Sequence, residues 1–186
     1  MHISRHYRDD HIKVENIETA ISIYEDQVRG WFFDHATNLE RVTDHAGLVT
    51  LLIVLSYIEG HANFYRGEDS KNNSKKFFRE AFIAVFGLSD NPNRDGAVDE
   101  LYDQMRCGLF HTGMTREHVR ISNGYPLPVS VIMNSTNKDW LVIEVNPRRM
   151  LEAAENHLSH YLMRLRDDKN TTLRDNFMKA WRMRGN

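Results

Sequence analysis

The chain of 186 residues contains one cysteine, Cys107, which excludes an internal disulfide and a zinc module built from several cysteines. Its longest apolar stretch, residues 46–58, is short of the roughly 20 residues that cross a bilayer. The N-terminal residues carry charges where a signal peptide has an apolar run of about 7–15 residues. No Walker or G-x-G-x-x-G phosphate loop occurs. We therefore expect a reduced, soluble, cytoplasmic protein that contacts no membrane.

What the chain does contain is typical of one folded domain. Apolar residues make up 41% and charged residues 27% of the sequence, too apolar a composition for a disordered chain. The formal net charge of −2 conceals an asymmetry: residues 1–105 hold 11 basic and 18 acidic side chains, whereas residues 146–186 hold 9 and 5. A basic C-terminal third suits either a polyanion or the acidic half of the same protein, and the counts alone leave both open.

Hydrophobic periodicity predicts a mostly α-helical bundle in a single domain over residues 1–186. Apolar residues recur at i, i+3, i+4 and i+7 through most of the chain. Thr43 or Asp44 could cap the second helix, Ser74 could cap the third and Gly87 could end it. Pro147 suits the first turn of a long C-terminal helix. We predict helices at about 12–39, 42–65, 75–86, 97–111 and 147–166, with a further short helix or frayed tail at 172–183.

The pattern changes between residues 118 and 146. Three short segments rich in β-branched residues begin at Val119, Pro128 and Trp140, and turn-forming residues separate them. We predict a small antiparallel β-meander, inserted before the long C-terminal helix and packed on the bundle.

The candidate chemistry lies in residues 102–116, where Arg106 and His111 flank a Cys and a Gly. Cleavage of RNA without a metal needs proton transfer at the ribose 2′-OH and at the leaving oxygen, and a cation for the phosphate. Histidine suits the first task and arginine the second. On an ideal helix, positions five apart point about 140° apart. Either the helix therefore bends or ends at Gly108, or two copies of the segment share a cleft across a dimer axis.

The string Arg106-Cys-Gly-Leu-Phe-His111, late in a helical domain, resembles the signature of the HEPN superfamily, an Arg followed after four to six residues by His. The apolar helix ending in Tyr57-Ile-Glu-Gly and the segment Lys76-Phe-Phe-Arg-Glu-Ala-Phe are similar to it too. The resemblance implies a helical bundle over most of residues 10–165 and a homodimer that cleaves RNA without metal or cofactor, in a toxin–antitoxin, phage-defence or RNA-processing role. It makes Arg106 the phosphate-binding residue and His111 the proton-transfer group.

Other residues of the segment are candidates for supporting roles. Glu59 could position Arg106 or act as an acid, although an ion pair with a neighbouring helix is the simpler role. Tyr102, Cys107 and Thr112 adjoin the motif. Cys107 could also pair with His111, four residues on, as a thiol nucleophile, but an unpaired cysteine more often packs in a core. Four basic side chains could follow an RNA backbone or be solvated: Arg116, Arg120, Arg148 and Arg149.

Metal binding is the weaker hypothesis for the ten histidines. His157 and His160 have helical ligand spacing, and Glu59 and His61 end the second helix, yet no third ligand lies near the histidine pair in the sequence. We interpret this pair as surface or interface residues and predict no metal site.

Two functions follow. The first is a metal-independent endoribonuclease that leaves 2′,3′-cyclic phosphate ends, with RNA as substrate and an antitoxin or other protein as a further partner. The second is a non-catalytic HEPN-like module that binds a nucleotide, RNA or a protein. It is favoured by Cys107, because the active enzymes usually have a polar residue directly after the arginine.

Overall fold

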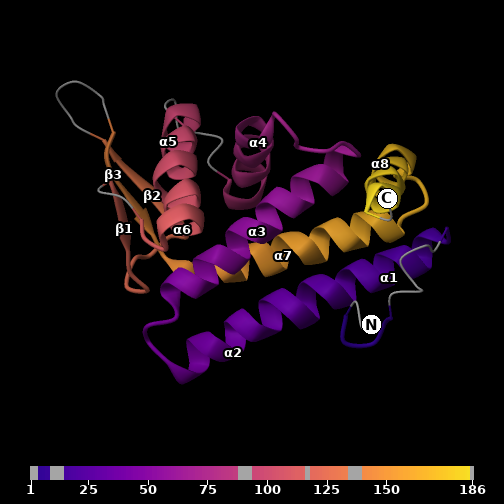
Figure 1. Cartoon of the computed structure of the whole chain (residues 1–186), viewed down its shortest axis with the longest axis horizontal. Coiled ribbons are helices and arrows are strands. Elements are labelled where there is room, and N and C mark those ends of the chain that lie inside the picture. The colour runs from indigo at the N-terminus through magenta and orange to yellow at the C-terminus, as the bar shows by residue number, and fades with distance from the viewer. Residues whose placement is uncertain (1–3, 9–14, 88–93, 116–117, 134–139, 185–186) are drawn as a thin grey trace.

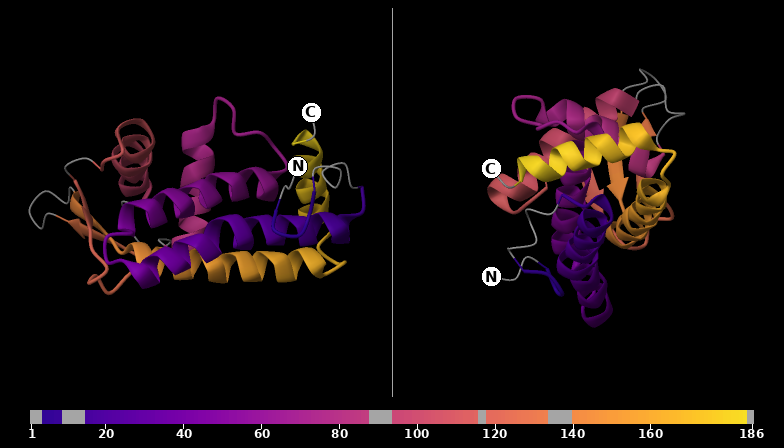
Figure 2. Two further views of the ribbon diagram at one scale, coloured as in Figure 1. Left: turned by 60° about the horizontal axis from the view of Figure 1, so that its bottom comes forward. Right: turned by 90° about the vertical axis from the view of Figure 1, so that its right-hand side faces the viewer.

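The computed structural model describes residues 4–8, 15–87, 94–115, 118–133 and 140–184. Long helices run side by side along the molecule, and a small sheet stands at one end (Figure 1). Helix α8 crosses the other end, as both further views show (Figure 2). The predicted mostly helical bundle with a small sheet before the long C-terminal helix is confirmed.

The first helical rod comprises α1 (Ile17–Gln27), the π-helical turn η2 (Val28–Phe33) and α2 (Asp34–Val42). Asn16 caps its N-terminus by accepting a hydrogen bond from the amide of Thr19 at 3.0 Å. The predicted start near residue 12 lies outside the described residues. The rod ends at Val42, three residues later than predicted.

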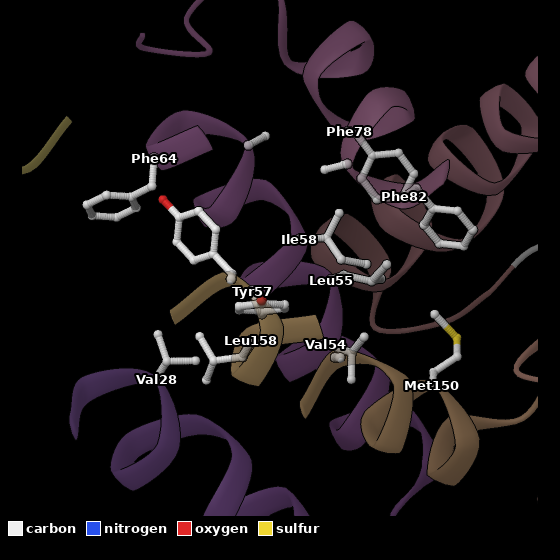
Figure 3. Packing of buried hydrophobic residues seen from close by; sticks show 14 of the residues in the cluster. Val28, Val54, Leu55, Tyr57, Ile58, Phe64, Phe78, Phe82, Met150 and Leu158 are labelled. Atoms are coloured by element: carbon white, nitrogen blue, oxygen red, sulfur yellow. The ribbon is translucent and has the colours of Figure 1, made fainter. Parts of the chain in front are cut away.

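Helix α3 (Gly47–Arg66) is the centre of the bundle, in contact with α2, α4, α7 and α8. Its side chains meet apolar residues of the neighbouring helices (Figure 3). By length and composition it could cross a membrane, but half of its apolar window is buried inside the fold. The predicted cap at Thr43 or Asp44 is wrong, because α3 begins after Ala46, which has no capping side chain.

The predicted helix over 97–111 is divided. It consists of α5 (Arg94–Leu101), a π-helical turn η4 (Tyr102–Arg106) and α6 (Cys107–Thr112). Before it, α4 (Ser74–Phe86) ends at Gly87 as expected, with a left-handed φ of 65°. Ser74 is not its cap; the Ser74 hydroxyl hydrogen-bonds the Tyr102 hydroxyl at 3.0 Å instead.

The prediction of an antiparallel meander is wrong, because the sheet is mixed. Strands β1 (Val119–Ile121), β2 (Val129–Met133) and β3 (Trp140–Val145) lie in the order β1-β3-β2. Strand β3 pairs antiparallel with β2 and parallel with β1. Strand β3 is the central strand, and its Ile143 and Val145 are fully buried. The turn at Asn123-Gly124 connects β1 to β2, which are not neighbours in the sheet.

The C-terminal part is α7 (Pro147–Arg166) followed by α8 (Thr171–Met183), so the tail predicted as a helix or a frayed end is a helix. Pro147 occupies the first turn of α7 as expected. Asn146 caps this turn: its Oδ1 accepts from the amide of Arg149 at 3.0 Å. Its Nδ2 donates to the carbonyl oxygens of Asn123 at 3.0 Å and Tyr125 at 2.7 Å. One buried amide therefore joins α7 to the loop after β1.

Replacing Asn146 with Ala is expected to lower the free energy of unfolding by about 2–4 kcal/mol, because it removes the cap and leaves two carbonyl groups without their donor. Urea denaturation followed by circular dichroism measures this. Asn156 is exposed on the same helix, so Asn156→Ala serves as the control and should change stability by less than about 0.5 kcal/mol. Equal effects of the two substitutions would contradict the assigned role of Asn146.

Candidate functional site

Arg106 and Glu59 form the centre of the candidate site. The Arg106 Nε donates to Glu59 Oε1, and its Nη2 donates to Glu59 Oε2 at 3.0 Å. The two side chains are 21% and 24% exposed, so the pair lies at the edge of the core where α3 meets η4. These hydrogen bonds raise the pKa of Arg106, which keeps its positive charge. The salt bridge expected for Glu59 is present, and its partner is Arg106.

Two aromatic rings hold the Arg106 guanidinium from either side along the helix. The Cζ atom of Arg106 lies 5.4 Å from the ring centre of Tyr102 and 4.9 Å from that of Phe110. Tyr102 is in turn fixed by the hydroxyl of Ser74 and by an edge contact with Phe78. Cation–π contacts of this kind add to the ion pair and limit the rotamers of the arginine. Arg106 is therefore held in one orientation.

One edge of the Arg106 guanidinium is not used by Glu59. A guanidinium has five N–H groups, and the Glu59 carboxylate takes one from Nε and one from Nη2. The Nη1 and Nη2 edge keeps three N–H groups, for which the described residues provide no acceptor. That edge has the fork geometry that binds a phosphate through two parallel hydrogen bonds.

His111 is exposed in the last turn of α6, next to Phe110, which is 45% exposed. It makes no hydrogen bond or ion pair with any described residue. Arg106 contacts Phe110 four residues on, and His111 points away from that face because α6 is regular over 107–112. A single chain does not bring the two motif side chains together.

The helix neither bends nor ends at Gly108. Helix α6 continues through Gly108 to Thr112, and Gly113 ends it with a φ of 71°. The irregular π-helical turn η4 lies before the motif, where the amide of Cys107 donates to the carbonyl of Tyr102. The arrangement in which the helix ends at Gly108 is therefore wrong.

The other two supporting candidates are Thr112 and Cys107. The Thr112 hydroxyl donates to the carbonyl of Gly108 at 2.9 Å within its own helix. Cys107 is half-buried and makes no hydrogen bond to His111 within the described residues, so the thiol-nucleophile hypothesis gains nothing.

The basic candidates differ in their surroundings. Arg120 on β1 and Arg149 on α7 are exposed. Arg148 is engaged: its Nε lies 3.7 Å from the carboxylate of Glu40, which also accepts from Thr50 at 2.7 Å. Arg116 lies outside the described residues.

The prediction that both histidines of α7 are surface or interface residues agrees with the structure for one of them. His160 is exposed, as predicted, whereas His157 is largely buried, with its Nδ1 2.8 Å from the hydroxyl of Tyr57. The pKa of His157 is lowered to about 4, mainly by burial and in addition by the nearby charges of His160 and Arg164. Among the described residues no group of three His, Cys, Asp or Glu side chains could hold a metal ion.

The sequence analysis considered His61 only as a metal ligand and did not predict that it lies beside His157. It is 3% exposed and surrounded by the rings of Tyr57, Tyr65, His157 and Tyr161. The only signal was its place at i+4 from Tyr57 on an apolar helix.

No family model, curated protein or solved structure matches this chain.

Proposed function

We propose that the protein is a metal-independent endoribonuclease of the HEPN type that acts as a homodimer. The observation that carries this proposal is the geometry of Arg106: Glu59 binds one edge of its guanidinium and leaves the other edge for a phosphate. Glu59 then acts as a positioning residue, because it fixes the arginine without neutralising the N–H groups of the free edge. His111 is exposed and makes no hydrogen bond with the described residues, so a substrate hydroxyl could reach its ring nitrogens.

The reaction proceeds by attack of the ribose 2′-OH on the adjacent phosphorus. His111 takes the hydroxyl proton, the 2′-oxygen bonds to phosphorus, and the 5′-oxygen leaves with a proton, which gives a 2′,3′-cyclic phosphate and a 5′-OH. Arg106 stabilises the charge that builds on the phosphate oxygens. Since His111 points away from Arg106 of its own chain, we assign the two groups of one cleft to different subunits.

The dimer arrangement draws support from the surface around α6. Phe110 is 45% and Met114 63% exposed, although both are large apolar side chains. Exposed apolar residues next to a candidate site are typical of surfaces that a second protein covers. In a two-fold dimer the same surface of each subunit meets its copy, so α6 of one subunit would lie opposite α6 of the other.

The experiment is a cleavage assay on single-stranded RNA in EDTA with four proteins. Wild type should cut and leave 2′,3′-cyclic phosphate ends. His111→Ala should lower the rate by about 10²–10⁴-fold, the range for loss of a general acid–base group. Arg106→Lys keeps a charge but loses the fork, and should lower the rate by about tenfold or more. His160→Ala, an exposed histidine on α7, is the control and should leave the rate unchanged.

Mixing the two impaired variants tests the shared cleft. Refolded together, Arg106→Lys and His111→Ala subunits form heterodimers in which one of two clefts has both native groups. Random pairing then restores roughly a quarter of the wild-type activity. No restoration, with heterodimers present, would mean that both groups act from one chain. Full cutting by His111→Ala would exclude the proposed mechanism altogether.

One observation favours the second candidate, a non-catalytic module that binds a nucleotide, RNA or protein. Cys107, directly after Arg106, is half-buried and makes no hydrogen bond within the described residues, so it offers no polar group to the candidate site. RNA binding by wild type without any cutting, and with equal affinity in His111→Ala, would select this function.

A further inference from the structure

A cavity of about 330 Å³ opens between the C-terminal half of α3, α4 and α7. It is separate from the candidate nuclease site: none of its lining residues belongs to η4 or α6. Its volume falls in the range of small-molecule sites in proteins, about 300–1,000 Å³. The question is which chemistry its walls would recognise.

The walls are apolar and aromatic. Ala62 and Ala81 contribute small side chains, and Phe77, Tyr65 and His61 contribute rings. Small side chains opposite flat rings leave a space suited to a planar group, which would make aromatic contacts on its faces.

His61 supplies a hydrogen-bonding group inside this cavity. It is 3% exposed, makes no hydrogen bond to the described residues, and its Nδ1 is buried without a partner. Burial lowers the pKa of His61 well below its ordinary value, and His157 lowers it further, so the ring is neutral near pH 7. A neutral imidazole has one N–H, and burial of an N–H without an acceptor costs more than burial of a lone pair. The hydrogen therefore belongs on Nε2, which leaves a donor for a ligand.

The charged groups of the cavity leave one cation free. The guanidinium of Arg66 forms an ion pair with Glu80 and lies 4.9 Å from the ring centre of Phe77. Arg164, on α7, is exposed, and its side chain has no hydrogen bond or ion pair with the described residues. Since Glu80 is occupied by Arg66, the unmatched charge at the cavity is positive and comes from Arg164.

We propose that this cavity binds a small planar aromatic carboxylate. The ring lies against Phe77 and His61, and the carboxylate accepts hydrogen bonds from the guanidinium of Arg164. The His61 N–H donates to a polar atom of the ligand within the cavity. The pairing of an apolar, ring-lined space with one free guanidinium is the juxtaposition that selects this class of ligand over a neutral or cationic one.

The test is a titration of the full chain with 2-naphthoate, monitored by ligand fluorescence and calorimetry, with the uncharged 2-naphthamide as a second ligand. Wild type should bind 2-naphthoate saturably and 2-naphthamide about tenfold or more weakly, because the amide lacks the charge-assisted hydrogen bonds. Arg164→Gln should weaken 2-naphthoate binding by the same factor and leave 2-naphthamide binding unchanged.

Two more variants complete the design. Ala84 is exposed and lines the cavity, so Ala84→Phe should fill the space and abolish binding of both ligands while the protein stays folded. Lys179→Gln removes an exposed cation on α8 that does not line the cavity, and it should leave the binding of both ligands unchanged. Absence of saturable binding to wild type, or binding that survives Ala84→Phe, would overturn the proposal. So would equal affinity for the two ligands.

Discussion

Substitution of Gly108 by alanine is expected to destabilise the protein, although Gly108 lies inside a helix, where this change normally stabilises. A Cβ built on Gly108 would lie 2.5 Å from the carbonyl oxygen of Met114. This oxygen belongs to backbone just beyond the left-handed turn at Gly113, so it cannot move aside as a flexible side chain could. Overpacking of this kind costs about 1–3 kcal/mol, whereas the gain in helix propensity is at most about 1 kcal/mol. The steric cost decides the sign.

Gly60 provides the matched control. It also lies inside a helix, α3, but a Cβ there would have no atom within 4 Å. Gly60→Ala should therefore raise the free energy of unfolding by about 0.5–1 kcal/mol, the ordinary gain of replacing glycine in a helix. Urea denaturation of both variants beside wild type gives the comparison. If both substitutions stabilise the protein, the close approach of Met114 to α6 is wrong.

The same substitution bears on function, since Gly108 lies between Arg106 and His111. Backbone that moves away from an added Cβ would shift residues 112–115 and the last turn of α6, which carries His111. In an RNA cleavage assay, Gly108→Ala should then lower activity while Gly60→Ala does not. The glycine of the motif is thus explained by close packing of the chain after α6.

Helices were predictable from this sequence because their signals are local. The period of apolar residues and the glycine that ends α4 located the helices to within a few residues at most ends. The pairing of Glu59 with Arg106 was anticipated as one role of Glu59, because a partly buried carboxylate on an apolar helix needs a cationic partner, although Glu59 lies inside α3 and not at its end.

What the sequence did not reveal depends on distant contacts. The π-helical turn at residues 102–106 adds one residue to a helix without any change in composition. The parallel pairing of β1 with β3 depends on which strand takes the central position, and this is decided by burial of Ile143 and Val145. The contact of His61 with His157 joins residues nearly a hundred positions apart, so periodicity carries no trace of it.

Acidification from pH 7 to pH 5 is expected to lower the free energy of unfolding by about 2 kcal/mol through His157 alone. The pKa of His157 is about 4 in the fold, against 6.5 for an unperturbed histidine. The unfolded chain therefore binds a proton as the pH falls below about 6.5, while the folded chain does not until about pH 4. The contribution of neutral His157 is complete above pH 6.5 and is lost progressively between these two values. His61 acts in the same direction, because burial lowers its pKa too.

The groups around His157 explain why its proton is so unfavourable in the fold. Tyr57 and His61 of α3 lie against the ring and carry no negative charge near pH 7. On α7 itself, His160 and Arg164 repel an added positive charge. Asp26 and Glu25 have pKa values lowered by their hydrogen-bond partners, so both carboxylates stay charged in the fold from pH 7 to pH 5.

Urea denaturation at pH 7, 6 and 5 of wild type, His157→Asn and His160→Asn isolates the effect. Asparagine keeps a polar side chain for the Tyr57 hydroxyl but cannot gain a proton, so His157→Asn should lose about 2 kcal/mol less than wild type over this interval. His160→Asn removes one of the charges that lower the pKa of His157, so it should lose less stability than wild type over this interval but more than His157→Asn. Histidines that do not interact with His157 or His160 contribute equally to all three proteins, and their effect cancels in the differences. Parallel curves for all three would place His157 in water, in contradiction to its contact with Tyr57 and His61.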